Sequence, residues 1–417
     1  MVASFFRKLL LIFMVTSAVA QTETEVAPPY NIKTAAFIQN NNNVIPVFEL
    51  GEGFQFQFDD LFGNEANYYY EIVHCDYNWK PTEIPKTDYL KGFDGQRIQQ
   101  YENSFNTLQT YSHYQLPIPN QFTQLLISGN YMLKILDEHK DIVLSRKFIL
   151  YENVVTIPMQ IRRARTANYL DSKHNIEFSI QSQAITFQNP LKNIKVVLFQ
   201  NGQMNSAIKN IAPQYTIGNE LIYKYDTQTQ FWAGNEFLYF DNNDIRAAGN
   251  TISRIDSGTG IYNTHLYTNN ARANFPYTLN PDANGNFVTR NIRGVRNEIE
   301  ADYAWVYFSL SAPAFMSKKS IYVTGMFNNY SLSPEYKLDF NAKTNTYEKA
   351  VLIKQGFTNY QYQIADDKGT IDGEKAIDGN FWQTENDYTI LVYYRQNNDR
   401  YERVIGKATA NSSIISN

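Results

Sequence analysis

The sequence predicts an all-β protein built from three consecutive β-sandwich domains. Three observations predict this class. Apolar and polar residues alternate with a period of two in many short runs, and Gly, Pro and Asn separate these runs. No segment sustains the 3.6-residue apolar stripe of a long helix. The 417 residues allow two to four domains, at roughly 100–200 residues each.

The first 20 residues have the pattern of a secretory signal peptide. The basic pair Arg7-Lys8 precedes an apolar run over 9–15, and Ala18-Val19-Ala20 offers the small residues that a signal peptidase requires. The apolar run is far shorter than the ~20 residues that span a bilayer, and no later segment is long enough. We therefore expect residues 1–20 to be removed and the mature protein to be exported without a transmembrane segment.

The first domain is expected over residues 28–152. Phe54, Phe56 and Phe58 alternate with glutamines, which is typical of a strand with one buried face. An extended run over 147–151 ends this block.

The second domain is expected over residues 153–297. Ile176, Phe178 and Ile180 alternate with polar residues, and a β-branched run follows over 194–199. Asn284-Gly285 is a favoured centre for a type I′ hairpin turn.

The third domain is expected over residues 298–406, followed by a flexible tail over 407–417. Large side chains alternate on both faces of 302–310, which predicts a strand covered on both sides. The segment 341–345 separates two strand-like runs, as a short hairpin loop does.

Composition argues against several function classes. The chain has 37 Lys+Arg and 41 Asp+Glu, and its formal net charge of -4 gives no reason to expect a nucleic-acid partner. Its five histidines lack the spacing of a helical zinc motif, and one cysteine cannot form an internal disulfide or a thiolate zinc site. We expect no catalytic residue, metal or cofactor, and therefore no enzyme.

His74, Cys75 and Asp76 form the most reactive-looking cluster. Neighbouring residues of a strand point to opposite faces, so His74 cannot serve Cys75 as a base if 68–75 is a strand. His74 and Asp76 share a face, where a structural hydrogen bond is more frequent than a catalytic relay.

Aromatic residues are abundant, with 31 Tyr and 27 Phe. In alternating segments they are expected in the core, whereas aromatics in irregular segments are candidates for an exposed binding surface. The candidate surface residues are Trp79, Trp232, Tyr330 and Trp382.

The third domain carries a local signature. Residues 320–330 end in Gly-Met-Phe-Asn-Asn-Tyr, and 356–362 read Gly-Phe-Thr-Asn-Tyr-Gln-Tyr. The pattern resembles early-set immunoglobulin-like modules related to glycogen-binding domains. The resemblance implies that Tyr330 is the aromatic that stacks on glucose in sugar-binding members, although 364–372 lack their second Trp. An exported carbohydrate-binding protein for glycan uptake is therefore the alternative function.

A second resemblance extends over nearly the whole mature chain. It is carried by separated motifs at 68–76, 88–93, 101–107, 111–114, 128–131, 234–237, 239–241, 300–303 and 385–394. Together these motifs resemble the type IX secretion system plug protein family of Bacteroidetes.

This resemblance implies a non-catalytic periplasmic protein associated with the outer membrane. Its expected partner is the giant outer-membrane translocon barrel, whose periplasmic mouth the plug closes when the lateral gate is open. Other periplasmic accessory proteins are further candidate partners. The family motifs assign no contact residue.

Overall fold

The computed structural model describes residues 22–258, 260–313 and 319–415, so the expected signal peptide lies outside the described residues. Within them, the strands build three β-sandwiches, called lobes here. Lobe 1 holds β1 to β11, lobe 2 holds β12 to β18 with β29 and β30, and lobe 3 holds β19 to β28. The all-β sandwich class predicted from the sequence is confirmed.

Lobe 1 packs two sheets around an aromatic core. Its outer sheet has the order β2 (Asn42–Asn43), β1 (Ile32–Gln39), β4 (Phe54–Asp60), β8 (Ser112–Ile118) and β7 (Gln100–Asn103). Its inner sheet has the order β3 (Val47–Glu49), β11 (Ile142–Tyr151), β10 (Gly129–Leu136) and β5 (Tyr69–Cys75). The short helix α1 (Lys86–Tyr89) leads into a small sheet of β6 (Leu90–Gly92) and β9 (Thr123–Leu125).

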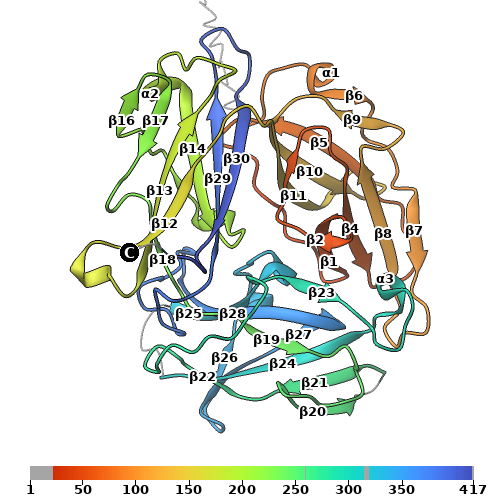
Figure 1. Cartoon of the computed structure of the whole chain (residues 1–417). Helices are drawn as coiled ribbons and strands as arrows, with labels where there is room; N and C mark the ends of the chain where they lie inside the picture. Colours follow the sequence, from red (N-terminus) through yellow and green to blue (C-terminus); the bar gives the residue numbers. More distant parts are fainter. Residues whose placement is uncertain (1–21, 259, 314–318, 416–417) are drawn as a thin grey trace, which may run out of the picture.

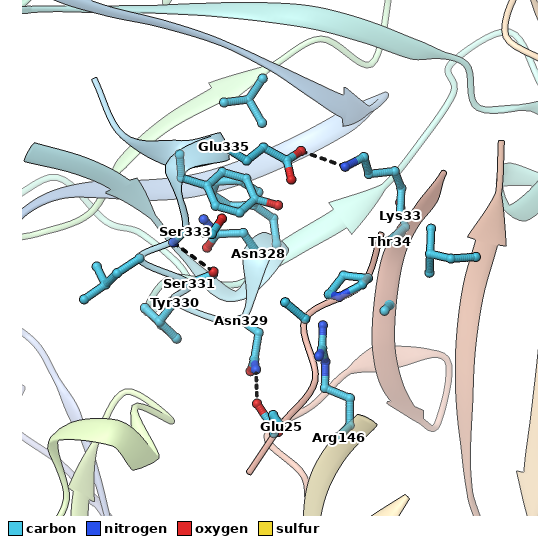
Figure 2. Close-up of a pocket in the computed structure, with 18 of the residues that line it drawn as sticks. Glu25, Lys33, Thr34, Arg146, Asn328, Asn329, Tyr330, Ser331, Ser333 and Glu335 are labelled. Atoms are coloured by element: carbon cyan, nitrogen blue, oxygen red, sulfur yellow. Dashed lines mark hydrogen bonds and ion pairs between the residues drawn. The ribbon is translucent and has the colours of Figure 1, made fainter. Parts of the chain in front are cut away.

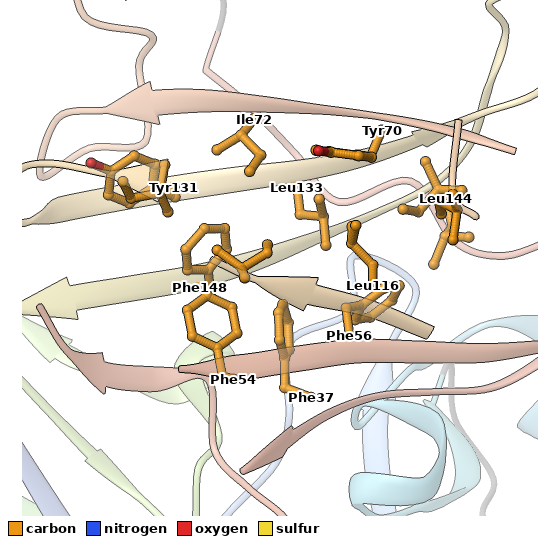
Figure 3. Close-up of a cluster of buried hydrophobic side chains, with 14 of the residues drawn as sticks. Phe37, Phe54, Phe56, Tyr70, Ile72, Leu116, Tyr131, Leu133, Leu144 and Phe148 are labelled. Carbon is orange, nitrogen blue, oxygen red and sulfur yellow. The ribbon is translucent and has the colours of Figure 1, made fainter. Parts of the chain in front are cut away.

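The alternation over 54–58 has the predicted result. Phe54, Phe56 and Phe58 are buried in the core of lobe 1, and Phe54 stacks on Phe48 with ring centroids 3.9 Å apart. Figure 3 shows Phe54 and Phe56 among the buried side chains. The intervening glutamines are only partly buried, because successive side chains of a strand point to opposite faces.

Lobe 2 is assembled from two distant parts of the chain. Its outer sheet has the order β12 (Met159–Arg163), β13 (Lys173–Gln181), β17 (Glu220–Tyr223) and β16 (Tyr215–Ile217), with β18 (Gln230–Trp232) also paired to β13. Its inner sheet has the order β15 (Ile208–Lys209), β14 (Ile194–Gln200), β29 (Asp387–Tyr394) and β30 (Arg403–Asn411). The short helix α2 (Pro190–Asn193) precedes β14.

Lobe 3 is inserted between the two parts of lobe 2. One sheet has the order β19 (Leu238–Asp241), β28 (Gly356–Asp366) and β23 (Phe287–Thr289), with β25 (Lys319–Thr324) also paired to β28. The other has the order β20 (Ile252–Ser257), β21 (Tyr262–Leu266), β24 (Tyr303–Ser311), β27 (Thr346–Lys354) and β26 (Asp339–Asn341), with β22 (Asn269–Asn270) paired to β24. The short helix α3 (Asn297–Glu300) precedes β24.

These pairings contradict part of the expected partition. The predicted boundary at 297/298 falls inside lobe 3, because β23 pairs with β28 across it. β29 and β30 were expected in the third domain or its tail, but they complete the inner sheet of lobe 2 next to β14. Residues 407–411 therefore belong to a strand. Apolar periodicity specifies which face of a strand is buried, but it does not specify the partner strand.

The three lobes lie around a common centre rather than in a row (Figure 1). Lobe 1, in red and orange, and lobe 2, in yellow-green and dark blue, lie side by side, and lobe 3 lies below both. Each lobe contacts the other two.

Candidate functional site: the junctions between the lobes

The junction of lobes 1 and 2 is a second hydrophobic layer between two sheets. Along β14, Ile194, Val196 and Leu198 enter the core of lobe 2, whereas Val197 and Phe199 point toward lobe 1. Along β29, alternate side chains likewise enter the core of lobe 2 or point toward lobe 1. The cluster shared by the lobes comprises Val47, Cys75, Tyr77, Trp79, Met132, Ile149, Val197, Phe199, Leu391, Tyr393 and Val404. The two inner sheets are therefore buried on both faces.

Hydrogen bonds fix the register of this layer. The Tyr77 hydroxyl donates to the carbonyl of Val196 at 3.1 Å, and the Tyr393 hydroxyl donates to Asn130 Oδ1 at 2.8 Å. Such bonds satisfy the polar ends of aromatic side chains that would be costly to bury unpaired.

The junction of lobes 1 and 3 contains a buried ion pair. Asp59 of β4 accepts hydrogen bonds from Lys354 Nζ and from the Tyr303 hydroxyl, each at 2.6 Å, and His113 Nδ1 lies 2.6 Å from its other oxygen. Tyr303 also bonds Thr34 at 2.6 Å. Both carboxylate oxygens of Asp59 therefore have hydrogen-bonding partners, and one of these partners is the charged Lys354 ammonium.

Burial alone would raise the pKa of the Asp59 carboxyl, but the Lys354 ammonium and the hydrogen bond from His113 hold it below its usual range. Burial lowers the pKa of Lys354, and Asp59 opposes this shift. Removing either partner would leave the other charge buried and unpaired, because both side chains are almost fully shielded from solvent.

The junction of lobes 2 and 3 is more polar. The Tyr330 hydroxyl donates to the carbonyl of Asn201 at 3.1 Å, and Asn284 Nδ2 donates to Asp387 at 2.9 Å. Gly373 lies so close to Trp232 that an added Cβ would be 2.5 Å from the indole Cδ1 atom. With this third junction, each lobe is held at two places, which restricts hinge motion at any single one.

The structure contradicts two of the four expected surface aromatics. Trp79 is only 8% exposed and lies in the cluster between lobes 1 and 2, and Tyr330 is 7% exposed between lobes 2 and 3. Trp232 and Trp382 are partly buried, with Lys173 Nζ 4.0 Å from the centre of one ring and Arg163 Cζ 4.2 Å from the other. Sugar stacking required Tyr330 and Trp382 on one exposed face, and the burial of Tyr330 removes that face.

The cluster around Cys75 has no nucleophile–base geometry. His74 Nδ1 bonds Thr82 Oγ1 at 2.8 Å, and Asp76 instead accepts the backbone N–H groups of Asn78 and Lys80. The expected hydrogen bond between His74 and Asp76 is therefore wrong. Burial raises the pKa of the Cys75 thiol to about 12, so the thiol stays protonated near neutral pH.

Sequence reasoning missed Asp59 and Lys354, which no motif connects because 295 positions separate them. Two further observations concern only residues 22–258, 260–313 and 319–415. They contain no group of three or more His, Cys, Asp or Glu side chains arranged to hold a metal ion. They also contain no helix that is long and apolar enough to cross a membrane.

The fold and its junctions define a multidomain all-β protein whose lobes form one body. Residues 32–152, which make up lobe 1, match the model of the Type 9 secretion system plug protein 1st domain. The first lobe is therefore assigned to the first domain of the type 9 secretion system plug proteins. This match links lobe 1 to a secretion system of the bacterial cell envelope.

A solved structure extends the similarity to all three lobes. The crystal structure of a hypothetical protein from Parabacteroides merdae ATCC 43184 matches with a TM-score of 0.88 and 29% sequence identity. The match covers 94% of this chain and 100% of that chain. No curated protein matches the chain.

Proposed function

We propose that the mature protein is a non-catalytic periplasmic plug of the type IX secretion system. In this proposal it occludes the periplasmic mouth of the outer-membrane translocon barrel when the lateral gate of the barrel is open. The family match of lobe 1 supports a role in this secretion system. The observation that carries the occluding role is the closure of three lobes into one body through three junctions.

The arrangement of the lobes matters for the area that they can cover. A barrel of about 36 strands is roughly 70 Å across. A sandwich of about 130 residues is roughly 36 Å across, so three in a row would cover a strip of roughly 110 by 36 Å. Three in a triangle fit within a circle of roughly 78 Å instead, so they extend across a round opening in every direction. The triangular arrangement thus supports occlusion of a wide round opening better than the row would.

The junctions also support mechanical resistance. An occluding body must keep its shape when unfolded cargo or solutes press on it. A chain of lobes joined only by linkers would flex, since domains move relative to one another by default. Here the buried ion pair between lobes 1 and 3 and the hydrophobic layer between the inner sheets of lobes 1 and 2 oppose such motion.

Two experiments test the proposal. Affinity purification of the tagged protein from native membranes should recover the translocon barrel, identified by mass spectrometry. Deletion of the gene should raise outer-membrane permeability to a small dye, and the wild-type gene should reverse this effect. A gene that encodes the Asp59→Ala variant should restore the low permeability poorly. A gene that encodes Arg400→Gln, at an exposed ion pair, should restore it fully. Unchanged leakage in a deletion strain with an otherwise uncovered barrel would overturn the proposal.

A further inference from the structure

A cavity of about 450 Å³ lies where lobe 3 faces lobe 1 and the segment before β1. One side is formed by β1 and by Arg146 and Lys147 of β11, and the other by residues of lobe 3 between 327 and 336. Figure 2 shows Arg146 and Lys33 on the first side and Asn328 to Glu335 on the second. A smaller cavity of about 60 Å³ adjoins it and shares Glu25, Arg146 and Lys147. The larger volume is in the range of small-molecule sites.

Arg146 has an unusual environment in this cavity. Its side chain is 8% exposed, yet its recorded hydrogen bond goes only to the carbonyl of its own neighbour, Ser145, at 3.0 Å. Its Nε atom is buried without a hydrogen-bond partner, and it forms no ion pair with any described residue. Figure 2 shows the guanidinium pointing from β11 toward lobe 3. A buried, unpaired charge is costly, so this arginine lacks the partner that its burial requires.

The two carboxylates that line the cavity are already engaged elsewhere. Glu335 pairs with Lys33 at 2.6 Å. Glu25 accepts the backbone N–H of Lys147 and the Nδ2 group of Asn329, both at 2.7 Å. Neither carboxylate is within ion-pair distance of Arg146. Lys33, Lys147 and Lys354 line the same cavity, so cationic side chains outnumber the carboxylates there.

Further polar groups of lobe 3 face the same cavity. Tyr336 lines it, and its hydroxyl has no hydrogen bond to any residue that the structure describes. Burial and the Glu335 charge raise the pKa of Tyr336, while Arg146 lowers it, which places the guanidinium within electrostatic reach of this hydroxyl. The remaining wall is mixed, and Ile32, Phe287 and Phe327 are among its apolar residues.

We propose that this cavity is a binding site for a small organic carboxylate. The planar carboxylate would accept hydrogen bonds from the Arg146 guanidinium and the Tyr336 hydroxyl, and its carbon skeleton would lie against the apolar part of the wall. A guanidinium binds a carboxylate through two parallel bonds. An organic carboxylate fits the cavity better than inorganic phosphate, because its carbon skeleton can contact the apolar residues of the wall. The inference does not depend on the plugging role.

Calorimetric titration of the protein without residues 1–20 tests the proposal, with benzoate as probe and neutral benzamide as its matched control. Benzoate should bind with one-to-one stoichiometry, while benzamide and inorganic phosphate should bind at least tenfold more weakly. Arg146→Gln should raise the Kd for benzoate at least tenfold, and Tyr336→Phe should raise it several-fold. Arg400→Gln, which removes an exposed arginine, should leave it unchanged. In a second arm, N-acetylphenylalanine and its amide show whether the carboxylate of a peptide end is also accepted.

The stability of the unliganded variants provides an independent measurement. Because Arg146 lacks a partner, Arg146→Gln should keep or raise the melting temperature, whereas loss of a structural arginine would lower it by several degrees. A lowered melting temperature would overturn the proposal. So would equal binding of benzoate and benzamide, benzoate binding unchanged in Arg146→Gln, or no saturable binding of either carboxylate.

Discussion

Asp59 and Lys354 form a buried ion pair of 2.6 Å between lobe 1 and lobe 3, although 295 positions separate them in the sequence. Asp59 also accepts hydrogen bonds from Tyr303 and contacts His113, so one carboxylate joins strands of both lobes. The free energy of this contact depends on keeping both charges, because solvent cannot replace either partner.

Asp59→Ala should reduce the free energy of unfolding by about 3–5 kcal/mol, because it leaves the Lys354 ammonium buried and unpaired. Lys354→Met should cost less, because the Tyr303 hydroxyl still donates a hydrogen bond to Asp59 and His113 stays in contact with it. Urea denaturation of both variants measures the difference. Arg400→Gln, at the exposed pair with Asp88, is the control and should cost at most about 1 kcal/mol. Equal costs for Asp59→Ala and Arg400→Gln would contradict this account.

Gly373→Ala should loosen the junction of lobes 2 and 3, because its Cβ would meet the indole of Trp232 at 2.5 Å. Overpacking of this kind typically costs about 1–3 kcal/mol. Limited proteolysis should then cut the segments that connect these lobes faster than in the wild type. Gly249→Ala has open space around the added methyl group and should leave the cleavage rate unchanged.

His174 should make the protein less stable in mild acid. Its ring nitrogens bond the Tyr388 hydroxyl at 2.8 Å and the carbonyl of Trp382 at 2.7 Å, and burial lowers its pKa from 6.5 to about 4. Between these values the unfolded chain binds a proton that the folded chain does not, so stability falls as the pH drops from about 6.5 to about 4.

Thermal unfolding measured across this pH range checks the histidine prediction. Wild-type stability should fall by up to about 1.4 kcal/mol per pH unit for this group. His174→Gln should show a shallower slope, whatever its absolute stability. His139→Gln, at an exposed histidine, should keep the wild-type slope. Identical slopes for all three proteins would exclude a buried neutral His174.

Asp282 should make the protein less stable as the pH rises, which is the opposite of the effect of His174 in nearly the same pH range. Burial raises its pKa from 3.8 to about 6, even though its carboxylate accepts backbone N–H groups of Asn284 and Phe237. The folded chain therefore binds the extra proton between about pH 4 and pH 6, and stability falls as the pH rises through this window.

Asp282→Asn should change the melting temperature more favourably at pH 7.5 than at pH 4, because the amide removes a buried charge that Asp282 carries only at the higher pH. The amide oxygen can accept only one of the two backbone N–H groups, and this loss is the same at both pH values. Asp137→Asn is the matched control, since Asp137 also accepts two backbone N–H groups in a turn. If Asp282→Asn changed the melting temperature equally at pH 4 and pH 7.5, the result would contradict the role of the Asp282 charge.

The residue pattern was sufficient to predict the strands and their buried faces. Phe54, Phe56 and Phe58 are buried as expected, and 341–345 joins β26 and β27 in a hairpin. Asn284 and Gly285 both have positive φ, as a type I′ turn requires, but β23 beyond this turn pairs with β28. Local turn chemistry specifies the turn and leaves the partner strand open.

The junctions could not be predicted in the same way. Trp79 and Tyr330 lie in irregular segments, which suggested exposure, yet neighbouring lobes cover them. Arg146 lies in a strand with an ordinary pattern, and only the approach of lobe 3 encloses it. Each of these environments arises from segments far apart in the chain, which a reading of neighbouring residues does not connect.

The insertion of lobe 3 into lobe 2 sets an order of events during biogenesis. β14 cannot pair with β29, which β30 flanks, until these strands leave the ribosome after the whole of lobe 3. Until then β14 has β15 on one edge, but its other edge lacks the strand that completes the inner sheet. A chaperone that binds extended apolar segments would thus have the longest time to bind the segment that becomes β14.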